Sequence, residues 1–270
     1  MYHDPMLYLL AIRRAGDGRR EGFPWTLPLI RDLEELEFRA PITLLVGENG
    51  CGKSTLLEGL AAGMGAVAAG SRDLERDETL AAARAFAAGF RFVRRRHPRT
   101  KLFLRAEDVF GFTGRVRRSL AELQELEEGF ARDLPEGSYG RMLATGAMAG
   151  QRGALARRYG ADPDARSHGE TFLNLLQQRL APNGLHFLDE PETPLSPTRV
   201  LGLLALLKDR VAHGCQFVIA THSPILMALP DAEILLLDDG RIARAAYDEL
   251  EHVRLTRDFL NAPERFLRHL

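Results

Sequence analysis

A glycine-rich loop carries the clearest chemical signal in the chain. Residues 47–54 read Gly-Glu-Asn-Gly-Cys-Gly-Lys-Ser, which fits the pattern G-x-x-x-x-G-K-S/T. The glycines let backbone N–H groups turn inward around phosphate oxygens, and a following helix adds the positive end of its dipole. Lys53 would reach the β- and γ-phosphates, and Ser54 would bind Mg²⁺. The loop predicts an ATP site and leaves the reaction open, because kinases, GTPases and motors also use such a loop.

The residues expected to contact ATP extend one position beyond this pattern. They are Gly47, Asn49, Gly50, Cys51, Gly52, Lys53, Ser54 and Thr55. Cys51 would lie at a helix N-terminus, which favours the thiolate form and would make this cysteine sensitive to alkylation. The simpler interpretation is a small residue that the loop tolerates.

A second motif supplies two acids. The apolar segment Leu185–Leu188 is followed directly by Asp189 and Glu190. Asp189 would hold Mg²⁺, and Glu190 would activate and orient the attacking water. Alone, the motif could also be a strand that ends in exposed acids. Together with the glycine-rich loop it predicts a hydrolytic site, in which Lys53 and Glu190 are catalytic.

Two further motifs occur along the chain, one before and one after the acidic motif. Ser-His-Gly-Glu at 167–170 precedes the acidic motif, and Thr-His-Ser at 221–223 follows the apolar run Gln216–Ala220. This order resembles that of the ABC-type ATPases, although 167–170 departs from their common Leu-Ser-Gly-Gly-Gln. More closely, the chain is similar to stand-alone bacterial ATPases of the AAA and RecF-like group. The similarity rests on the segments 47–54, 103–107, 167–170, 188–192, 220–226 and 255–265.

The resemblance implies a homodimer that holds ATP between two copies. The glycine-rich loop of one copy would face the signature segment of the other. This segment is formed by Ser167, His168, Gly169 and Glu170. His222 would sense the γ-phosphate as a third catalytic residue. Two structural alternatives stay open, because Ser-x-x-Glu is also a helix-capping box and a lone histidine is often a buried core residue.

Three other residues are candidates for contacts with the nucleotide or the metal. Glu107 would face Mg²⁺ or the attacking water, and its alternative role is that of an ordinary surface carboxylate. Phe23 or Trp25 would stack on the adenine, as an aromatic residue ahead of the loop does in transporter ATPases. The alternative for both rings is a small core of their own.

The charge balance limits the choice of partners. The net charge is −1, so the molecule as a whole is not an electrostatic binder of nucleic acid. A local exception is the cluster Arg94, Arg95 and Arg96, which could contact phosphate backbones. A run of this kind is more often a solvated face, or a partner for the acidic segment 119–136.

A parallel sheet is needed to bring these residues together. Strands are expected over 7–12, 42–46, 102–104, 185–188, 216–220 and 233–237, and helices over 54 to about 69, 119–128, 170–180 and 197–210. Strands that alternate with helices predict an α/β fold, here a P-loop NTPase with an ABC-ATPase-like mixed sheet and flanking helices.

We expect one domain over 1–270. Its core comprises 1–80 and 167–270, and a helical sub-domain is inserted at about 81–166. Within this insertion, residues 133–166 read as irregular because they are rich in glycine, proline and arginine.

Composition excludes several other classes of protein. Hydrophobic residues make up 45% of the chain and charged residues 27%, which is typical of a globular protein rather than a disordered or fibrous one. Two cysteines give no disulfide framework. There is no signal-peptide pattern and no apolar run of membrane-spanning length. We therefore expect a soluble, cytoplasmic protein.

The leading hypothesis is a soluble ATPase that binds and hydrolyses ATP with Mg²⁺. As an ATP-dependent homodimer it would act as a switch in DNA maintenance, defence or regulation. The alternative is the ATPase subunit of a membrane transporter, which the altered signature and the lack of glutamine between residues 56 and 123 disfavour. A small-molecule kinase is disfavoured by Glu190, since it would rarely need a second acid beside the metal-binding one. An unknown protein partner is compatible with all three.

Overall fold

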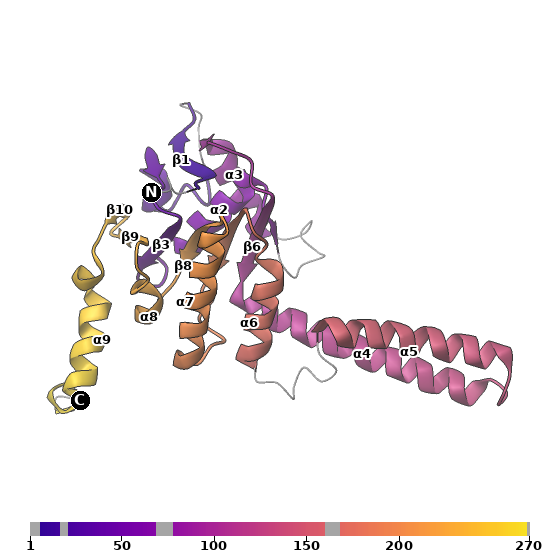
Figure 1. Ribbon diagram of the computed structural model, residues 1–270. Helices are drawn as coiled ribbons and strands as arrows, with labels where there is room; N and C mark the ends of the chain where they lie inside the picture. Colours follow the sequence, from indigo (N-terminus) through magenta and orange to yellow (C-terminus); the bar gives the residue numbers. More distant parts are fainter. Residues whose placement is uncertain (1–5, 17–20, 69–77, 160–167, 269–270) are drawn as a thin grey trace.

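The computed structural model describes residues 6–16, 21–68, 78–159 and 168–268 (Figure 1). Among them, the side chains of 78–80, 107–117, 157–159 and 168 are not described. The described residues form a seven-stranded sheet in the order β10-β9-β3-β8-β7-β6-β4. The strands are β3 (Ile42–Gly47), β4 (Val67–Ala68), β6 (Thr100–Arg105), β7 (Gly184–Asp189), β8 (Gln216–Ala220), β9 (Glu233–Asp238) and β10 (Arg241–Arg244). Only β10 runs antiparallel to its neighbour, so the sheet is mixed.

Helices cover both faces of this sheet. On one face lie α2 (Lys53–Met64) and α3 (Glu78–Gly89), and on the other α6 (His168–Arg179), α7 (Pro197–Ala212) and α8 (Pro224–Met227). Adjacent residues of β3 point to opposite faces of the sheet. Leu44 packs in the same buried cluster as Phe172 of α6, and Leu45 packs in a second cluster with Leu57 of α2. Strands buried on both faces read as continuous apolar runs, which is why the sequence reveals them.

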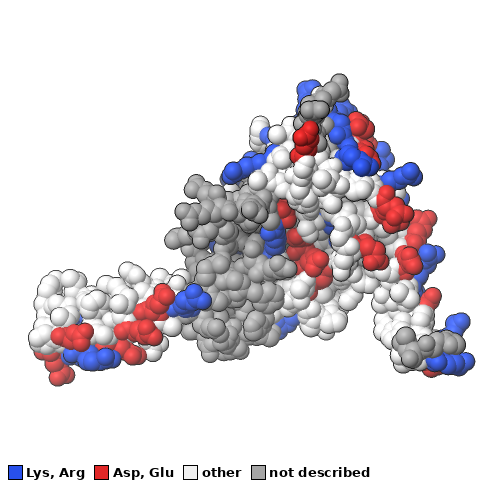
Figure 2. Space-filling model, turned by 180° about the vertical axis from the view of Figure 1, so that it is seen from behind, with Lys and Arg blue, Asp and Glu red and all other residues white. Residues whose placement is uncertain are grey.

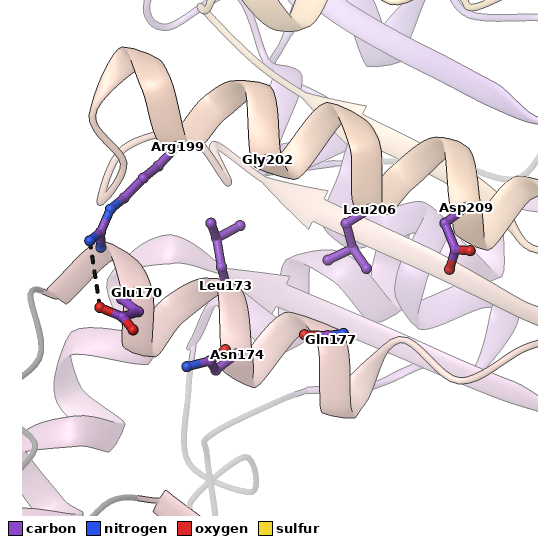
Figure 3. A pocket seen from close by; sticks show the side chains of 8 residues that line it. All are labelled: Glu170, Leu173, Asn174, Gln177, Arg199, Gly202, Leu206 and Asp209. Atoms are coloured by element: carbon purple, nitrogen blue, oxygen red, sulfur yellow. Dashed lines mark ion pairs between the residues drawn. The ribbon is translucent and has the colours of Figure 1, made fainter.

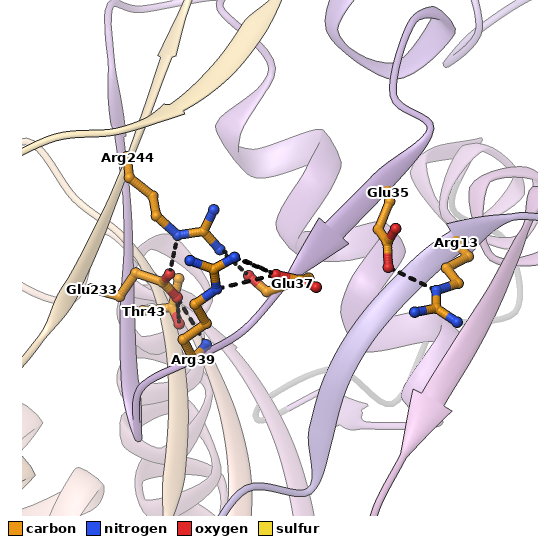
Figure 4. A network of polar contacts seen from close by, with 7 residues as sticks. All are labelled: Arg13, Glu35, Glu37, Arg39, Thr43, Glu233 and Arg244. Atoms are coloured by element: carbon orange, nitrogen blue, oxygen red, sulfur yellow. Dashed lines mark hydrogen bonds and ion pairs between the residues drawn. The ribbon is translucent and has the colours of Figure 1, made fainter.

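A second, antiparallel sheet of three described strands has the order β2-β1-β5. Its strands are β1 (Leu9–Arg14), β2 (Glu35–Glu37) and β5 (Phe90–Arg94), and the short helix α1 (Pro28–Arg31) precedes β2. Ion pairs join the two sheets at their edges (Figure 4). Arg244 contacts Glu233 at 2.7 Å and Glu37 at 4.0 Å, and the backbone N–H of Arg39 donates to Glu233 at 3.1 Å.

A helical hairpin projects from the body (Figure 1). It consists of α4 (Ala106–Asp133) and α5 (Tyr139–Tyr159), and Arg152 of α5 pairs with Glu127 of α4 at 3.0 Å. Figure 2 shows its charged side chains gathered along one edge. The prediction of irregular structure over 133–166 was wrong for the residues of α5, because pairing with α4 outweighs the low helix propensity of its glycines.

The hairpin is smaller than the insertion expected at about 81–166. Helix α3 packs on α2, β5 pairs with β1, and β6 pairs with β7 inside the large sheet. Those three elements therefore belong to the two sheets and their covering helices. Helix α2 is also shorter than expected, because Gly65 ends it in the left-handed conformation with φ 65°.

The C-terminal part follows β10 as η1 (Tyr247–Glu249), α9 (Glu251–Asn261) and α10 (Pro263–Leu267). Helix α9 contacts the body mainly at its start, where Val253 is buried and His252 Nε2 lies 3.0 Å from Met227 Sδ. Leu260, further along, is 72% exposed. None of the described helices is both long and apolar enough to cross a bilayer. The predicted α/β P-loop NTPase fold with a mixed sheet is confirmed by the strand order and the strand–loop–helix unit at 42–64.

Candidate nucleotide site

The loop between β3 and α2 has the backbone that its glycines predict. Gly50 and Gly52 lie in the left-handed region, with φ of 81° and 101°, where other residues are strained. Gly47 is required for a different reason. A Cβ atom at this position would lie 2.3 Å from the carbonyl oxygen of Leu237 in β9. The loop can therefore pass directly against the neighbouring strand and then turn its N–H groups around a phosphate.

Lys53 opens α2 and is held inside the loop. Its side chain is 5% exposed, and Nζ donates to the carbonyl oxygens of Gly47 at 2.9 Å and Glu48 at 2.8 Å. Cys51 is half-buried, with Sγ 3.9 Å from Nζ. A buried ammonium needs polar partners, and here the loop supplies them. The ammonium thus lies across the loop, where phosphate oxygens can replace one or both carbonyl groups.

Ser54 and Asp189 come together from distant parts of the sequence. Ser54 Oγ donates to Asp189 Oδ1 at 3.2 Å. Burial raises the pKa of Asp189 from 3.8 to about 6, and the hydrogen bond from Ser54 opposes that rise. A cation beside the carboxylate would favour its ionised form. The pair therefore has the chemistry of a hard-cation site.

The donor set suits Mg²⁺ in particular. The described residues contain no cluster of three or more histidine, cysteine or acidic side chains that could enclose a metal ion. Mg²⁺ in nucleotide enzymes is usually held by one or two protein ligands, substrate phosphates and water. Ser54 and Asp189 fit that pattern. Glu107, the other predicted ligand, is the second residue of α4, and its side chain lies outside the described part.

Glu190 and His222 face each other at the ends of adjacent strands. Strands β7 and β8 pair in parallel, with Asp189 opposite Ala220, and the N–H of Glu190 donates to the Ala220 carbonyl at 2.9 Å. His222 Nε2 lies 3.7 Å from Glu190 Oε1. Glu190 has φ 47°, an uncommon backbone for a non-glycine residue. Strain of this kind is concentrated at functional sites.

Glu192 is a polar residue of this edge whose role the sequence analysis did not identify. Its Oε1 accepts three hydrogen bonds from the loop after β8: from the Thr221 hydroxyl at 2.6 Å, the His222 N–H at 2.8 Å and the Ser223 N–H at 3.1 Å. The sequence offers only a weak signal, a third acid close after the Asp-Glu pair. Nothing in the local pattern indicates that this acid meets a loop far along the chain.

The predicted signature segment is described only in part. Ser167 lies outside the described residues, and the side chain of His168 is not described. Gly169 is buried, and a Cβ there would lie 3.0 Å from both the carbonyl oxygen of Pro194 and Cδ of Arg199. Glu170 is exposed and 3.7 Å from Arg199. In this chain the start of α6 therefore lies against residues 194–199, which are not part of the glycine-rich loop.

A groove between α6 and α7 begins at this point (Figure 3). It encloses about 560 Å³ and runs from Glu170 and Arg199 to Gln177 and Asp209. Its lining contains no residue of the loop 47–54 or of the acidic motif. The groove is therefore separate from the candidate nucleotide site.

The remaining predicted residues differ in exposure. Trp25 is buried and stacks on Phe90 with ring centroids 5.9 Å apart, which matches the core alternative, whereas Phe23 is 55% exposed. Of the cluster 94–96, Arg94 donates to the carbonyl oxygen of Gly63 at 2.7 Å. All three arginines of the cluster are exposed.

Comparison with known proteins gives one family match. A family model described as "AAA domain" matches residues 25–116, which include the glycine-rich loop and α2. No curated protein matches the chain at a significant level.

Solved structures similar to the chain include three ABC transporter proteins. One is a metal-chelate type ABC transporter in an inward-facing conformation, with 19% identity, 93% of this chain and 88% of that chain covered, and a TM-score of 0.46. Another is an ATP-binding subunit of an ABC transporter, with 19% identity, 93% of each chain and a TM-score of 0.40. The third is CbiO1 from Clostridium perfringens, part of the transporter complex CbiONQ, with 16% identity, 98% and 100% coverage and a TM-score of 0.43.

Proposed function

We propose that the chain is a P-loop ATPase that hydrolyses ATP with Mg²⁺ and acts as a nucleotide-dependent switch. The match of an AAA domain model to residues 25–116 supports the ATPase assignment. One observation carries this proposal. The Ser54–Asp189 pair, Lys53 and the facing Glu190 and His222 all lie at the ends of the adjacent strands β3, β7 and β8. This proximity supports the proposal that a metal-binding pair, a phosphate-binding cation and a base act together at one edge of the sheet.

Each side chain has a role that follows from its position. Lys53 and the N–H groups at the start of α2 bind the phosphate oxygens. Ser54 and Asp189 hold Mg²⁺, which supplies charge neutralisation at the β- and γ-phosphates. Glu190 is 44% exposed and accepts a proton from the attacking water, while His222 contacts the γ-phosphate. Hydrolysis then cleaves the bond between the γ-phosphorus and the bridging oxygen, giving ADP and phosphate.

We further propose that the site is completed by a second copy of the chain. The signature segment, Ser167 to Glu170, would approach the γ-phosphate across the interface. One feature supports this arrangement. The N-terminus of α6 offers N–H groups suited to an anion, and the carboxylate of Glu170 is paired with Arg199 at 3.7 Å.

For the biological output we propose a role in DNA maintenance, defence or regulation. The supporting feature is the exposed cluster Arg94, Arg95 and Arg96. The alternative is that the chain serves as the ATPase subunit of a membrane transporter. A co-purifying integral membrane protein would favour that alternative.

The decisive test is the variant Glu190→Gln. It should bind ATP as tightly as the wild type, release phosphate at least about 100-fold more slowly, and double in mass when ATP and Mg²⁺ are added. Mass by light scattering and phosphate release are the measurements. The double variant Lys53→Ala/Glu190→Gln is the control, because it should lose tight ATP binding and remain monomeric. A Glu190→Gln protein that stays monomeric with bound ATP would contradict the dimer, and one with wild-type turnover would contradict the assigned base.

A further inference from the structure

One carboxylate oxygen of Glu192 accepts hydrogen bonds from all three residues of the loop 221–223. Oε1 accepts from Thr221 Oγ1 at 2.6 Å, from His222 N at 2.8 Å and from Ser223 N at 3.1 Å. We propose that Glu192 is a positioning residue that holds His222 against Glu190. This inference rests on the proposed ATP hydrolysis, and it assigns to Glu192 a role in turnover rather than in binding.

The backbone around Glu192 is itself fixed. The N–H of Thr193 donates to the Glu190 carbonyl at 3.1 Å, and the N–H of Leu195 donates to the Glu192 carbonyl at 2.8 Å. Pro191, which is buried, restricts the chain between the two glutamates. Glu192 therefore extends from a rigid turn, and its side chain can act as a fixed anchor.

The hydrogen bonds that Glu192 accepts are stronger than bonds between neutral groups. An ionised acceptor shortens and strengthens its bonds to N–H and O–H groups. Without the carboxylate, the N–H groups of His222 and Ser223 would lose this acceptor at a part-buried site, which is costly. The loop would then rearrange so that these N–H groups could donate to water, and the imidazole of His222 would move with the loop.

The other hydrogen bonds of this loop are made by the residues on either side of the histidine. The N–H of Thr221 donates to the Leu45 carbonyl at 3.2 Å. Ser223 Oγ caps the short helix α8 by accepting from Leu226 N at 3.3 Å, and Thr221 follows directly after β8. His222 lies between these fixed ends. Its backbone N–H is bound by Glu192, and its Nε2 lies 3.7 Å from Glu190 Oε1. The position of the imidazole relative to the base therefore depends on Glu192.

The first experiment compares Glu192→Ala with the wild type. ATP affinity should stay within about twofold, because the glycine-rich loop is untouched. The rate of turnover at saturating ATP should fall about 10- to 100-fold, the size expected when a catalytic group moves by about 1 Å. Glu192→Gln keeps one acceptor oxygen and should recover part of the rate. Glu125→Ala, on the exposed side of α4, is the matched control and should behave as the wild type.

A double-mutant cycle with His222→Ala separates positioning from a general structural role. If Glu192 acts through His222, the double variant should turn over no more slowly than His222→Ala alone. Losses that multiply would overturn the proposal, and so would a wild-type rate in Glu192→Ala. If Glu192→Ala does not fold, the same cycle with Glu192→Gln decides the matter. Failure of the proposed function would look different, since the wild type would then release phosphate no faster than Glu190→Gln.

Discussion

At the scale of single residues, the candidate site consists of side chains from three strand ends: Lys53 and Ser54 after β3, Asp189 and Glu190 at the end of β7, and His222 after β8. Lys53, Ser54 and Asp189 follow from local patterns, because a phosphate loop and a strand ending in acids are each contiguous. Glu192 could not be assigned in this way. Its partners at 221–223 reach it only because β7 and β8 pair in parallel, with Asp189 opposite Ala220. A hydrogen bond between the ends of two strands has no signature in either segment.

His186 gives a prediction about stability and pH. It is fully buried in β7, where its ring lies 5.3 Å from that of Phe217, and burial lowers its pKa from 6.5 to about 4. Between these values the unfolded chain binds more protons than the folded one. The stabilisation contributed by the neutral ring is therefore complete above pH 6.5 and is lost as the pH falls toward 4. The loss should be on the order of 3 kcal/mol.

Urea unfolding at several pH values checks this expectation. His186→Phe, which cannot titrate, should show a flatter dependence of the unfolding free energy between pH 6.5 and 4 than the wild type. Equal slopes in the two proteins would show that other groups control acid stability.

At the scale of elements, the sequence predicts the buried strands well and the hairpin poorly. The strands β3, β7 and β8 are covered on both faces, so their apolar runs are continuous. Helix α5 contains Gly140, Gly146, Gly150 and Gly153, and such a composition favours a loop. What makes it helical is its long antiparallel contact with α4, which includes the Arg152–Glu127 pair. That contact is not local in sequence, so propensity alone cannot predict it.

The glycines of α5 also give a stability prediction. A Cβ at Gly146 or Gly150 would have no neighbouring atom within 4 Å, and both positions are exposed in the helix interior. Gly146→Ala and Gly150→Ala should therefore stabilise the helix by roughly 0.5–1 kcal/mol each, because alanine loses less backbone entropy. Slower amide hydrogen exchange in α5 is the expected result. Gly59→Ala is a contrasting variant, since its Cβ would lie 2.3 Å from Phe86, and it should destabilise the protein.

At the scale of the whole molecule, charge is nearly balanced, and any contact with nucleic acid must come from a local patch. The cluster Arg94, Arg95 and Arg96 begins at the last residue of β5, an edge strand of the small sheet. If this patch binds DNA, affinity should fall steeply with salt. Changing all three arginines to glutamine should reduce the slope of log affinity against log salt by about one for each phosphate that the variant no longer neutralises.

Fluorescence anisotropy with a short labelled duplex is the measurement. Arg132→Gln, on the exposed surface of α4, is a control that should leave binding unchanged. A wild-type protein without salt-dependent binding would remove DNA from the proposed output. The transporter alternative would then gain support.

The projecting hairpin has a consequence for how the molecule moves through water. Helix α4 has 28 residues, which corresponds to a rod about 42 Å long. A compact chain of 270 residues would have a radius of gyration of only about 18 Å. At the same mass, a chain with a projecting rod has a higher frictional coefficient than a compact one. A single chain should therefore sediment slowly and leave a sizing column early. Calibrated against spheres, a monomer would look heavier than it is, and a dimer could be claimed where none exists.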